Sequence, residues 1–322
     1  MCYSAQIWAE YRKFEREFGA VMSLQQYVRF FWERRRDETW RKIPKRMKDA
    51  FAQPRDDAER EIQALIAEGD AELEQNLQAE LFKQKKRLAD AERALAIKLT
   101  KNAQNEQRIA RDKMEAAQRQ LADLQRTDPL DRDARIYPGQ YVPVMILHEG
   151  QRMIVPMRYQ CRLPGWTETM ERKYPGTYNA RRDNLEKTWA KLFGYRHGIM
   201  VVNAFYENVA KHKAEHRELA AGEKEENLVL EFRPSPPHDM LVACLWNHHK
   251  GNEAGEGELF SFAAITDDPP PEIAAAGHDR CIIPIKPANV DAWLNPDPED
   301  LTALYAILDD RDRPYYQHRL AA

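Results

Sequence analysis

The sequence predicts an α+β protein: a mixed, β-rich domain that is interrupted near its N-terminus by a long helical insertion. From Asp56 to about Thr127 there is no proline and a single glycine, and apolar residues recur at helical steps. From about Arg132 onward, short β-rich runs alternate with Pro, Gly, Asn and Asp. The 322 residues suffice for one large domain or two modest ones.

The helical segment carries two heptad-like apolar series, a spacing typical of a narrow seam between helices. The first series runs Ile62, Ile66, Leu73, Leu77, Leu81, Leu88, Ala91, Leu95 and Leu99, and the second runs Ala110, Met114, Ala117, Leu121 and Leu124. The polar residues 100–108 between them predict the tip of an antiparallel, coiled-coil-like hairpin. The alternative is a single helix about 100 Å long that dimerises through the same seam.

Before the hairpin lies a basic and aromatic zone. Residues 11–50 contain twelve Lys or Arg against six Asp or Glu. We therefore divide the chain into a catalytic domain (1–10 and 129–322), a basic aromatic helical arm (11–55) and a helical hairpin (56–128). Two interpretations of the arm stay open: its arginines 34–36 track a nucleic-acid strand, or its aromatic residues anchor the hairpin.

Five runs in the last part of the chain have the composition of β-strands. They are residues 141–147, 199–204, 228–232, 241–245 and 260–266.

Composition limits the expected localisation and the expected partners of the protein. Hydrophobic residues make up 43%, charged residues 31%, and the mean hydropathy is −0.75. No apolar run is as long as a membrane span, and the first thirty residues lack a signal-peptide pattern. We expect a cytoplasmic protein without a membrane partner. The net charge of −3 implies that any nucleic-acid surface is local.

The four cysteines form no C-x-x-C pair, so the sequence predicts neither a disulfide framework nor a zinc cluster. Cys161, Cys244 and Cys281 are expected to be buried thiols. His238, His248 and His249 lack a partner at ligand-like spacing and are expected to be solvent-facing loop residues. We therefore expect no metal and no cofactor.

Cys2 differs because of its position after Met1. Removal of Met1 by an aminopeptidase would give Cys2 a free α-amine beside its thiol. The amine has a pKa near 8 and the thiol one near 8.5, so both are partly nucleophilic at neutral pH. Together they can capture an aldehyde as an imine and close it to a thiazolidine.

Six short motifs follow in the second half of the chain. They are Tyr137-Pro138-Gly139-Gln140, Met157-Arg158-Tyr159 through Leu163-Pro164-Gly165-Trp166, Tyr178-Asn179-Ala180-Arg181, His197 through Asn208, Leu245-Trp246, and Gly277-His278-Asp279-Arg280. In this order, and with a cysteine at position 2, the pattern resembles the SOS response-associated peptidase (SRAP) family. The resemblance covers residues 1–4 and roughly 131–300, and it does not extend to the hairpin.

The resemblance implies a DNA-damage enzyme that crosslinks itself to abasic sites in single-stranded DNA. It implies a catalytic set in which Cys2 is the nucleophile, Asn179 holds the N-terminal residue, Glu207 is the acid/base and His278 assists proton transfer. It also implies a DNA-binding set, which comprises Arg181, Trp166, Pro138, Arg158 and Arg280. A carboxyl with a raised pKa and a histidine near neutrality would suit the opening of the closed sugar.

The sequence departs from the family pattern at several positions. Tyr3-Ser4 replace Gly-Arg, which removes an expected phosphate contact. Asp183 and Asn208 replace a glutamate and a tryptophan. The presumed catalytic side chains are unchanged, so the departures mark a divergent branch.

Two other functions fit the same residues. One is a cysteine peptidase that removes its own Met1, with the thiol as nucleophile and histidine as base. The other is a DNA-binding scaffold whose helical segment recruits a protein partner or self-associates. AP-lyase cleavage through an uncyclised imine would accompany the crosslinking function.

Overall fold

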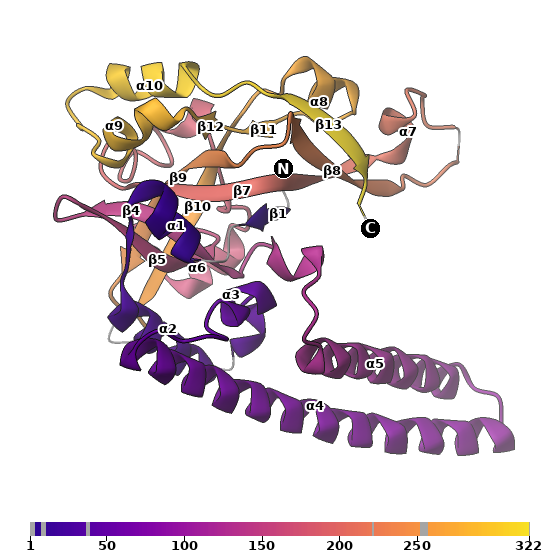
Figure 1. The fold of residues 1–322 in the computed structure, drawn as a ribbon. Helices are drawn as coiled ribbons and strands as arrows, with labels where there is room; N and C mark the ends of the chain where they lie inside the picture. Colours follow the sequence, from indigo (N-terminus) through magenta and orange to yellow (C-terminus); the bar gives the residue numbers. More distant parts are fainter. Residues whose placement is uncertain (1–3, 8–10, 37–38, 221, 252–256, 322) are drawn as a thin grey trace. The chain divides into compact units, whose positions relative to one another are not determined.

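The computed structural model describes residues 4–7, 11–36, 39–220, 222–251 and 257–321. They form two compact units. The sheet unit comprises Met1–Tyr27, Arg41–Ala50 and Asp131–Ala322, and the hairpin unit comprises Val28–Trp40 and Phe51–Leu130. A long helical segment and a sheet with both parallel and antiparallel pairs are present (Figure 1), which confirms the predicted α+β class.

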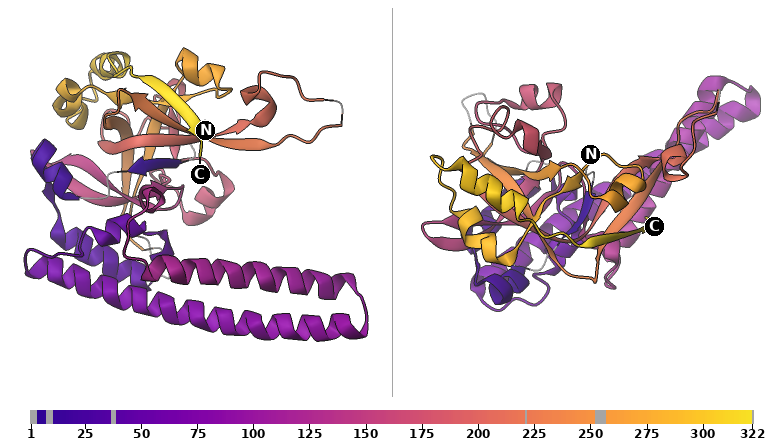
Figure 2. Two further views of the ribbon diagram at one scale, coloured as in Figure 1. Left: turned by 45° about the vertical axis from the view of Figure 1, so that its right-hand side comes forward. Right: turned by 90° about the horizontal axis from the view of Figure 1, so that it is seen from above.

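The hairpin unit is built on two long helices, α4 (Asp57–Ile97) and α5 (Lys101–Gln125), which run side by side in opposite directions (Figure 2). Asp56 caps α4 by accepting the N–H of Glu59 at 2.8 Å. Thr100 caps α5 by accepting the N–H of Ala103 at 3.2 Å. The hairpin is confirmed, but its predicted tip at 100–108 was wrong. Because Thr100 is a good N-cap, α5 starts directly after it and only residues 98–100 form the tip.

Burial in the hairpin follows a repeat of seven or eight residues. The buried positions are Ile62, Gly69, Leu77, Gln84 and Ala91 on α4 and Ala103, Ala110 and Ala117 on α5. Small residues at most of these positions let the two helices approach closely. The predicted seam included Leu99, but this residue is 74% exposed because it lies in the tip.

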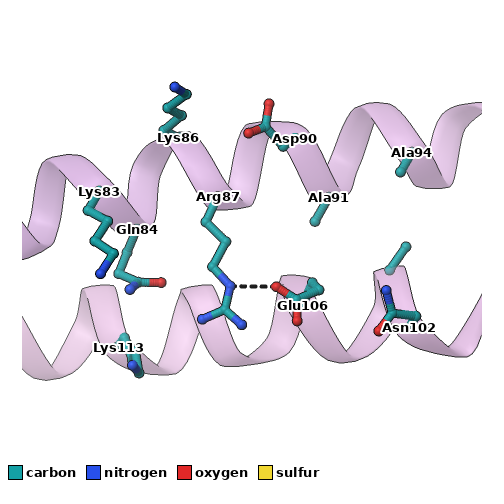
Figure 3. Close-up of a pocket in the computed structure, with 11 residues that line it drawn as sticks. Lys83, Gln84, Lys86, Arg87, Asp90, Ala91, Ala94, Asn102, Glu106 and Lys113 are labelled. Atoms are coloured by element: carbon teal, nitrogen blue, oxygen red, sulfur yellow. Dashed lines mark hydrogen bonds and ion pairs between the residues drawn. The ribbon is translucent and has the colours of Figure 1, made fainter.

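Near the tip, the two helices border a groove of about 570 Å³ (Figure 3). The side chains of Lys83 and Gln84 extend from α4 toward α5, and Arg87 donates to Glu106 across the groove at 2.6 Å. Lys86 points away from α5. The ion pair between Arg87 and Glu106 therefore bridges the helices where the seam residues are Gln84 and alanines.

The aromatic residues of the predicted arm are mostly buried. Within the hairpin unit, the ring of Phe31 lies 5.7 Å from that of Phe51 and 5.9 Å from that of Trp40. The indole N–H of Trp40 donates to Asp70 at 2.7 Å, and its ring covers Gly69, where a Cβ would lie 2.5 Å from a ring atom. A glycine is therefore required in the middle of α4.

One arginine of the arm, Arg35, is also engaged inside the hairpin unit. Arg35 pairs with Glu68 and, at 2.6 Å, with Glu72. These contacts pack the arm residues within the hairpin unit, where Trp32 is 47% exposed, and the anchoring interpretation stays a prediction. A DNA-tracking role for the arm stays a prediction.

The sheet unit contains thirteen strands among the described residues. The first seven are β1 (Ser4–Ile7), β2 (Val21–Met22), β3 (Arg135–Ile136), β4 (Tyr141–His148), β5 (Gln151–Tyr159), β6 (Asn179–Arg181) and β7 (His197–Ala210). The others are β8 (Asn227–Ser235), β9 (Met240–His249), β10 (Leu259–Asp267), β11 (Cys281–Ile282), β12 (Pro284–Ile285) and β13 (Tyr315–Leu320). The five strand runs predicted from the sequence lie in β4, β7, β8, β9 and β10, so those predictions are confirmed.

Strand pairing produces a closed ring. β7 pairs with β9, β9 with β10, β10 with β5, β5 with β4, and β4 again with β7. All these pairs are antiparallel except β10 with β5. The ring holds the core, which includes the fully buried Phe262.

The second half of β7 leaves the ring and forms the centre of an open sheet. Its neighbours there are β1, which pairs with β3, and β8, which pairs with β13. Ser4 on β1 lies directly opposite Tyr206 on β7. This open sheet brings the start of the described chain beside the strand that carries Glu207.

Shorter helices occur between the strands and before the hairpin. They are α1 (Tyr11–Phe18), α2 (Leu24–Arg36), α3 (Lys45–Asp49), α6 (Glu168–Lys173), α7 (Lys211–Ala214), α8 (Pro271–Ala275), α9 (Val290–Leu294) and α10 (Leu301–Asp309). Single 3-10 turns are η1 (Trp40–Lys42), η2 (Asp131–Ala134), η3 (Arg182–Asn184) and η4 (Pro287–Asn289). No helix in the described part of the chain combines the length and the apolar character needed to cross a membrane.

Candidate active site

Glu207 is a carboxyl group placed in the interior by strand alternation. Side chains alternate between the faces of a strand, so Glu207 shares its face of β7 with Phe205 and Val209, while Tyr206 points to the other face. Glu207 is fully buried. A buried carboxyl is costly without a polar neighbour, and the imidazole of His278 lies beside it.

His278 reaches Glu207 because the turn after α8 packs tightly on β7. Gly277 has φ +93°, and a Cβ there would lie 2.9 Å from both Val209 Cγ1 and Lys213 Cβ. Only glycine fits this approach without displacing the turn. The next residue, His278, is then 6% exposed, with its Nε2 3.1 Å from Glu207 Oε2.

The hydrogen bonds of His278 define where its protons lie. Its Nδ1 is 2.9 Å from the backbone carbonyl oxygen of Arg280, which can only accept, so Nδ1 carries a proton. Burial lowers the pKa of His278 to about 4, so the ring is neutral near pH 7 and Nε2 is an acceptor. The 3.1 Å contact with Glu207 is therefore a hydrogen bond only if the carboxyl carries a proton. The expected histidine near neutrality was wrong because burial disfavours its cation.

Asn179 and Arg181 lie on β6, which pairs with β10 at the register Asn179↔Ala264. Asn179 is 9% exposed, and its side-chain oxygen accepts the hydroxyl of Tyr159 at 3.3 Å. The Arg181 guanidinium donates to Asp183 at 3.1 Å and lies 3.8 Å from Asp268. Arg181 is partly exposed, so an anion can compete with these carboxylates.

The other predicted DNA-binding residues have different surroundings. The ring of Trp166 lies 5.7 Å from that of Tyr174, which is 51% exposed, and Pro138 is half-buried in the turn before β4. Arg280 donates two hydrogen bonds of 3.1 Å to the neighbouring Asp279. These three predicted DNA contacts stay predictions.

Arg158 belongs to a buried ion-pair network. It pairs with Glu171 and donates to the Gln160 carbonyl at 3.1 Å. Arg162 shares the same carboxylate at 3.0 Å, and Glu171 is 3% exposed. The geometry gives Arg158 a structural partner, so any contact with DNA is in addition to that role.

Cys2 lies outside the described residues. The three other cysteines are buried free thiols, as predicted, and burial raises the pKa of each. Among the described residues, no group of three or more His, Cys, Asp or Glu is arranged to hold a metal ion.

The prediction of solvent-facing loop histidines was wrong for His248 and His249. Both lie in β9 and are half-buried, because the β-run continues past Leu245. His248 forms an ion pair with Glu258 and stacks on Phe260.

Sequence reasoning missed a polar network on the other face of the open sheet. Tyr206 donates to Gln6 at 3.4 Å, and Arg233 donates to the same oxygen at 2.7 Å. Arg135 lies over the Tyr206 ring at 3.8 Å and donates to Ser4 at 3.1 Å. The alternation of β7 was the available signal, because it places Tyr206 on the opposite face from Glu207.

The fold and the site define an α+β protein with a buried carboxyl–imidazole pair beside its first strand. The chain belongs to the SOS response associated peptidase (SRAP) family, whose model matches residues 98–319. Membership of this family supports a function associated with DNA damage. The matched region contains Asn179, Glu207 and His278 and excludes Cys2.

Three solved structures are similar over part of the chain. A protein from Bordetella bronchiseptica has 18% identity and a TM-score of 0.45, covering 59% of this chain and 87% of that one. A phage-related protein from the same species has 18% identity and a TM-score of 0.42, covering 58% and 81%. A protein from Bacteroides thetaiotaomicron has 13% identity and a TM-score of 0.42, covering 54% and 73%. No curated protein matches the sequence.

Proposed function

We propose that this protein captures abasic sites in single-stranded DNA covalently, through the amine and thiol of Cys2 after removal of Met1. The observation that carries the proposal is the buried Glu207–His278 pair, in which His278 Nε2 lies 3.1 Å from Glu207 Oε2. Family membership supports the same chemistry.

An abasic deoxyribose is mostly a closed hemiacetal, so a proton on the ring oxygen is needed before the aldehyde opens. Glu207 donates that proton while the anomeric hydroxyl of the sugar loses one, so the opening needs no net proton, and His278 Nε2 keeps the carboxyl oriented. The Cys2 amine then adds to the aldehyde carbon, and loss of one water gives an imine. Addition of the Cys2 thiol to the imine carbon closes the thiazolidine ring, with no net oxidation or reduction.

The start of β1 lies beside the strand that carries Glu207. Ser4 lies opposite Tyr206, the residue before Glu207 in β7. Two peptide units limit the distance between the Cα atoms of Cys2 and Ser4 to about 7 Å. The covalent chain therefore restricts Cys2 to the neighbourhood of the strand that carries Glu207.

Other residues would bind the strand that contains the lesion. Arg181 offers its guanidinium to a phosphate in exchange for its carboxylate contacts. Trp166, stacked near Tyr174, offers an aromatic platform for a base, and such stacking is independent of sequence. Asn179 would hold the N-terminal residue.

The test is a denaturing gel after incubation with an abasic oligonucleotide. Wild type should give a shifted band that survives denaturation, and Cys2→Ala should not. Cys2→Ser separates the two nucleophiles, because it keeps the amine but cannot form a thiazolidine. Cys2→Ala and Cys2→Ser should still cleave the strand by β-elimination through the imine. A wild-type protein that gives no band, or a Cys2→Ala variant that gives the same band, overturns the proposal.

The acid role of Glu207 has its own test. Glu207→Gln should slow crosslinking strongly, and the wild-type rate should fall at high pH because ring opening needs a proton. The matched control is Glu226→Gln, which removes a carboxylate that is 68% exposed and paired with Lys211. Equal rates in wild type and Glu207→Gln would remove this residue from the mechanism.

Measurement of the intact mass of the protein shows whether Met1 has been removed. The proposal requires a mature protein that starts at Cys2. A protein that retains Met1 has a blocked amine and is expected to form no thiazolidine. Release of Met1 that depends on the Cys2 thiol would support an autopeptidase activity, in line with the word peptidase in the family description.

A further inference from the structure

Arg135 belongs to β3, and its guanidinium lies beside Ser4, the first residue of β1. It has no carboxylate partner among the described residues. Its Nε donates to Ser4 Oγ at 3.1 Å, and its guanidinium carbon lies 3.8 Å from the centre of the Tyr206 ring and 5.1 Å from that of Tyr137. Across residues 4–7, 11–36, 39–220, 222–251 and 257–321, no ion pair involves it. The two rings and one hydroxyl hold the cation in a fixed place.

The neighbouring cations differ in this respect. Arg233 and Arg319 both pair with the buried Glu231, and Arg233 also lies 4.0 Å from Asp131. Arg135 is half-buried and has five N–H donors, of which one has a protein acceptor among the described residues. The remaining donors are oriented but unused, which is the arrangement expected of an anion site.

Ser4 connects this cation to the reaction. The guanidinium is hydrogen-bonded to Ser4, and the covalent chain keeps the Cα atom of Cys2 within about 7 Å of that of Ser4. Glu207 and Arg135 thus approach the start of β1 from opposite faces of the open sheet. A phosphate attached to a sugar bound at Cys2 would lie within reach of Arg135.

We propose that Arg135 binds the phosphate beside the sugar that Cys2 captures. This inference rests on the proposed function. The planar guanidinium suits two oxygens of one phosphate, and the tyrosine rings leave its edge available while they cover its face. Arg135 then determines the position of the lesion along the strand as well as adding affinity.

The first experiment measures reversible binding of an undamaged single-stranded oligonucleotide by the Cys2→Ala protein at several salt concentrations. Arg135→Gln should reduce the slope of log K against log salt by about 0.7, the value for one phosphate contact on a single strand. The matched control is Arg217→Gln, which removes the same charge from a guanidinium already paired with Glu215 and Glu223. An unchanged slope in Arg135→Gln, or an equal fall in Arg217→Gln, overturns the inference.

A second experiment locates the phosphate. Abasic oligonucleotides with one neutral methylphosphonate are compared in crosslinking by wild type and Arg135→Gln. At the contacted position, neutralisation should slow wild type but leave the variant unaffected. Equal effects on both proteins at every position overturn the inference.

Two further variants separate binding from positioning and from folding. Ser4→Ala removes the hydrogen bond but keeps the charge, so it should retain the wild-type slope; a slope as low as that of Arg135→Gln would show that Arg135 only anchors β1. If Arg135→Gln does not fold, Arg135→Lys is used instead. It keeps the charge but lacks the planar guanidinium, so it should bind the oligonucleotide more weakly at an unchanged salt slope. Unchanged affinity in Arg135→Lys counts against the inference. A wild-type protein that binds DNA without crosslinking refutes the proposed function, while the slope still tests Arg135.

Discussion

Lowering the pH from 7 to 5 should weaken the sheet unit, and His197 should account for about 2 kcal/mol of the loss. His197 is 2% exposed, and its Nε2 accepts the backbone N–H of Gly194 at 2.9 Å. Its Nδ1 therefore carries the proton and donates to the Trp293 carbonyl at 3.1 Å. A second proton on Nε2 would face the N–H of Gly194, in a buried site that solvates the charge poorly.

The sign and the size of this stability loss follow from the protonation of His197 in the folded and in the unfolded chain. Burial lowers the pKa of His197 from 6.5 to about 3 in the folded protein. Between these values the unfolded chain binds one more proton than the folded chain. The stability is thus fully present above pH 6.5 and is lost as the pH falls toward 3, by about 1.4 kcal/mol per unit. His278, with a pKa of about 4, adds a second loss in the same window.

The assay is denaturant unfolding at pH 7, 6 and 5, followed by tryptophan fluorescence. Between pH 6 and 5, the slope of stability against pH should be smaller in His197→Asn than in wild type by about one proton. The control is His216→Asn, at an exposed histidine whose φ of +52° asparagine tolerates. It should keep the wild-type slope. A His197→Asn protein with the wild-type slope would refute the buried neutral histidine.

Three further substitutions test packing. Gly277→Ala should cost about 1–3 kcal/mol in denaturant unfolding and slow crosslinking, because the turn must shift; Gly222→Ala, with φ +82° but open space around it, should leave crosslinking unchanged. Glu171→Gln should destabilise by about 3–5 kcal/mol in the same assay, since Arg162 keeps a buried charge, and a loss below about 1 kcal/mol would contradict this. Gly69→Ala should lower the thermal midpoint, because overpacking against the Trp40 ring costs about 1–3 kcal/mol and exceeds the helix-propensity gain of about 1 kcal/mol. A higher midpoint would refute the close contact between Gly69 and Trp40.

Local sequence signals predicted much of the fold. The strand runs were recognisable because β-branched and aromatic residues cluster between turn residues, and the hairpin was recognisable from its periodicity. The choice of seam residues was less predictable. Gly69 and Gln84 are buried although neither is apolar, because the helix geometry fixes which positions face the partner helix. Leu99 is apolar but exposed, because the cap at Thr100 places it in the tip.

The site was predictable as a set of residue types but not as an arrangement. The motifs selected Glu207 and His278, which are 71 positions apart, without indicating that they touch. Their contact depends on Gly277 and on strand alternation, which are properties of the folded chain. Arg135 carried no motif, because its role follows from the pairing of β1 between β3 and β7.

The contacts of the His278 ring bear on the choice between the two enzymatic alternatives, the crosslinking enzyme and the cysteine peptidase. A thiol peptidase needs a histidine that accepts the proton of the thiol, and the free nitrogen of the ring must face the sulfur. In His278, Nδ1 is held by the Arg280 carbonyl and Nε2 by Glu207. Neither nitrogen can accept a thiol proton unless one of these bonds breaks. A peptidase mechanism through His278 would therefore need its contact with Arg280 or with Glu207 to change, and the Cys2 and Glu207 variants test which reaction the pair assists.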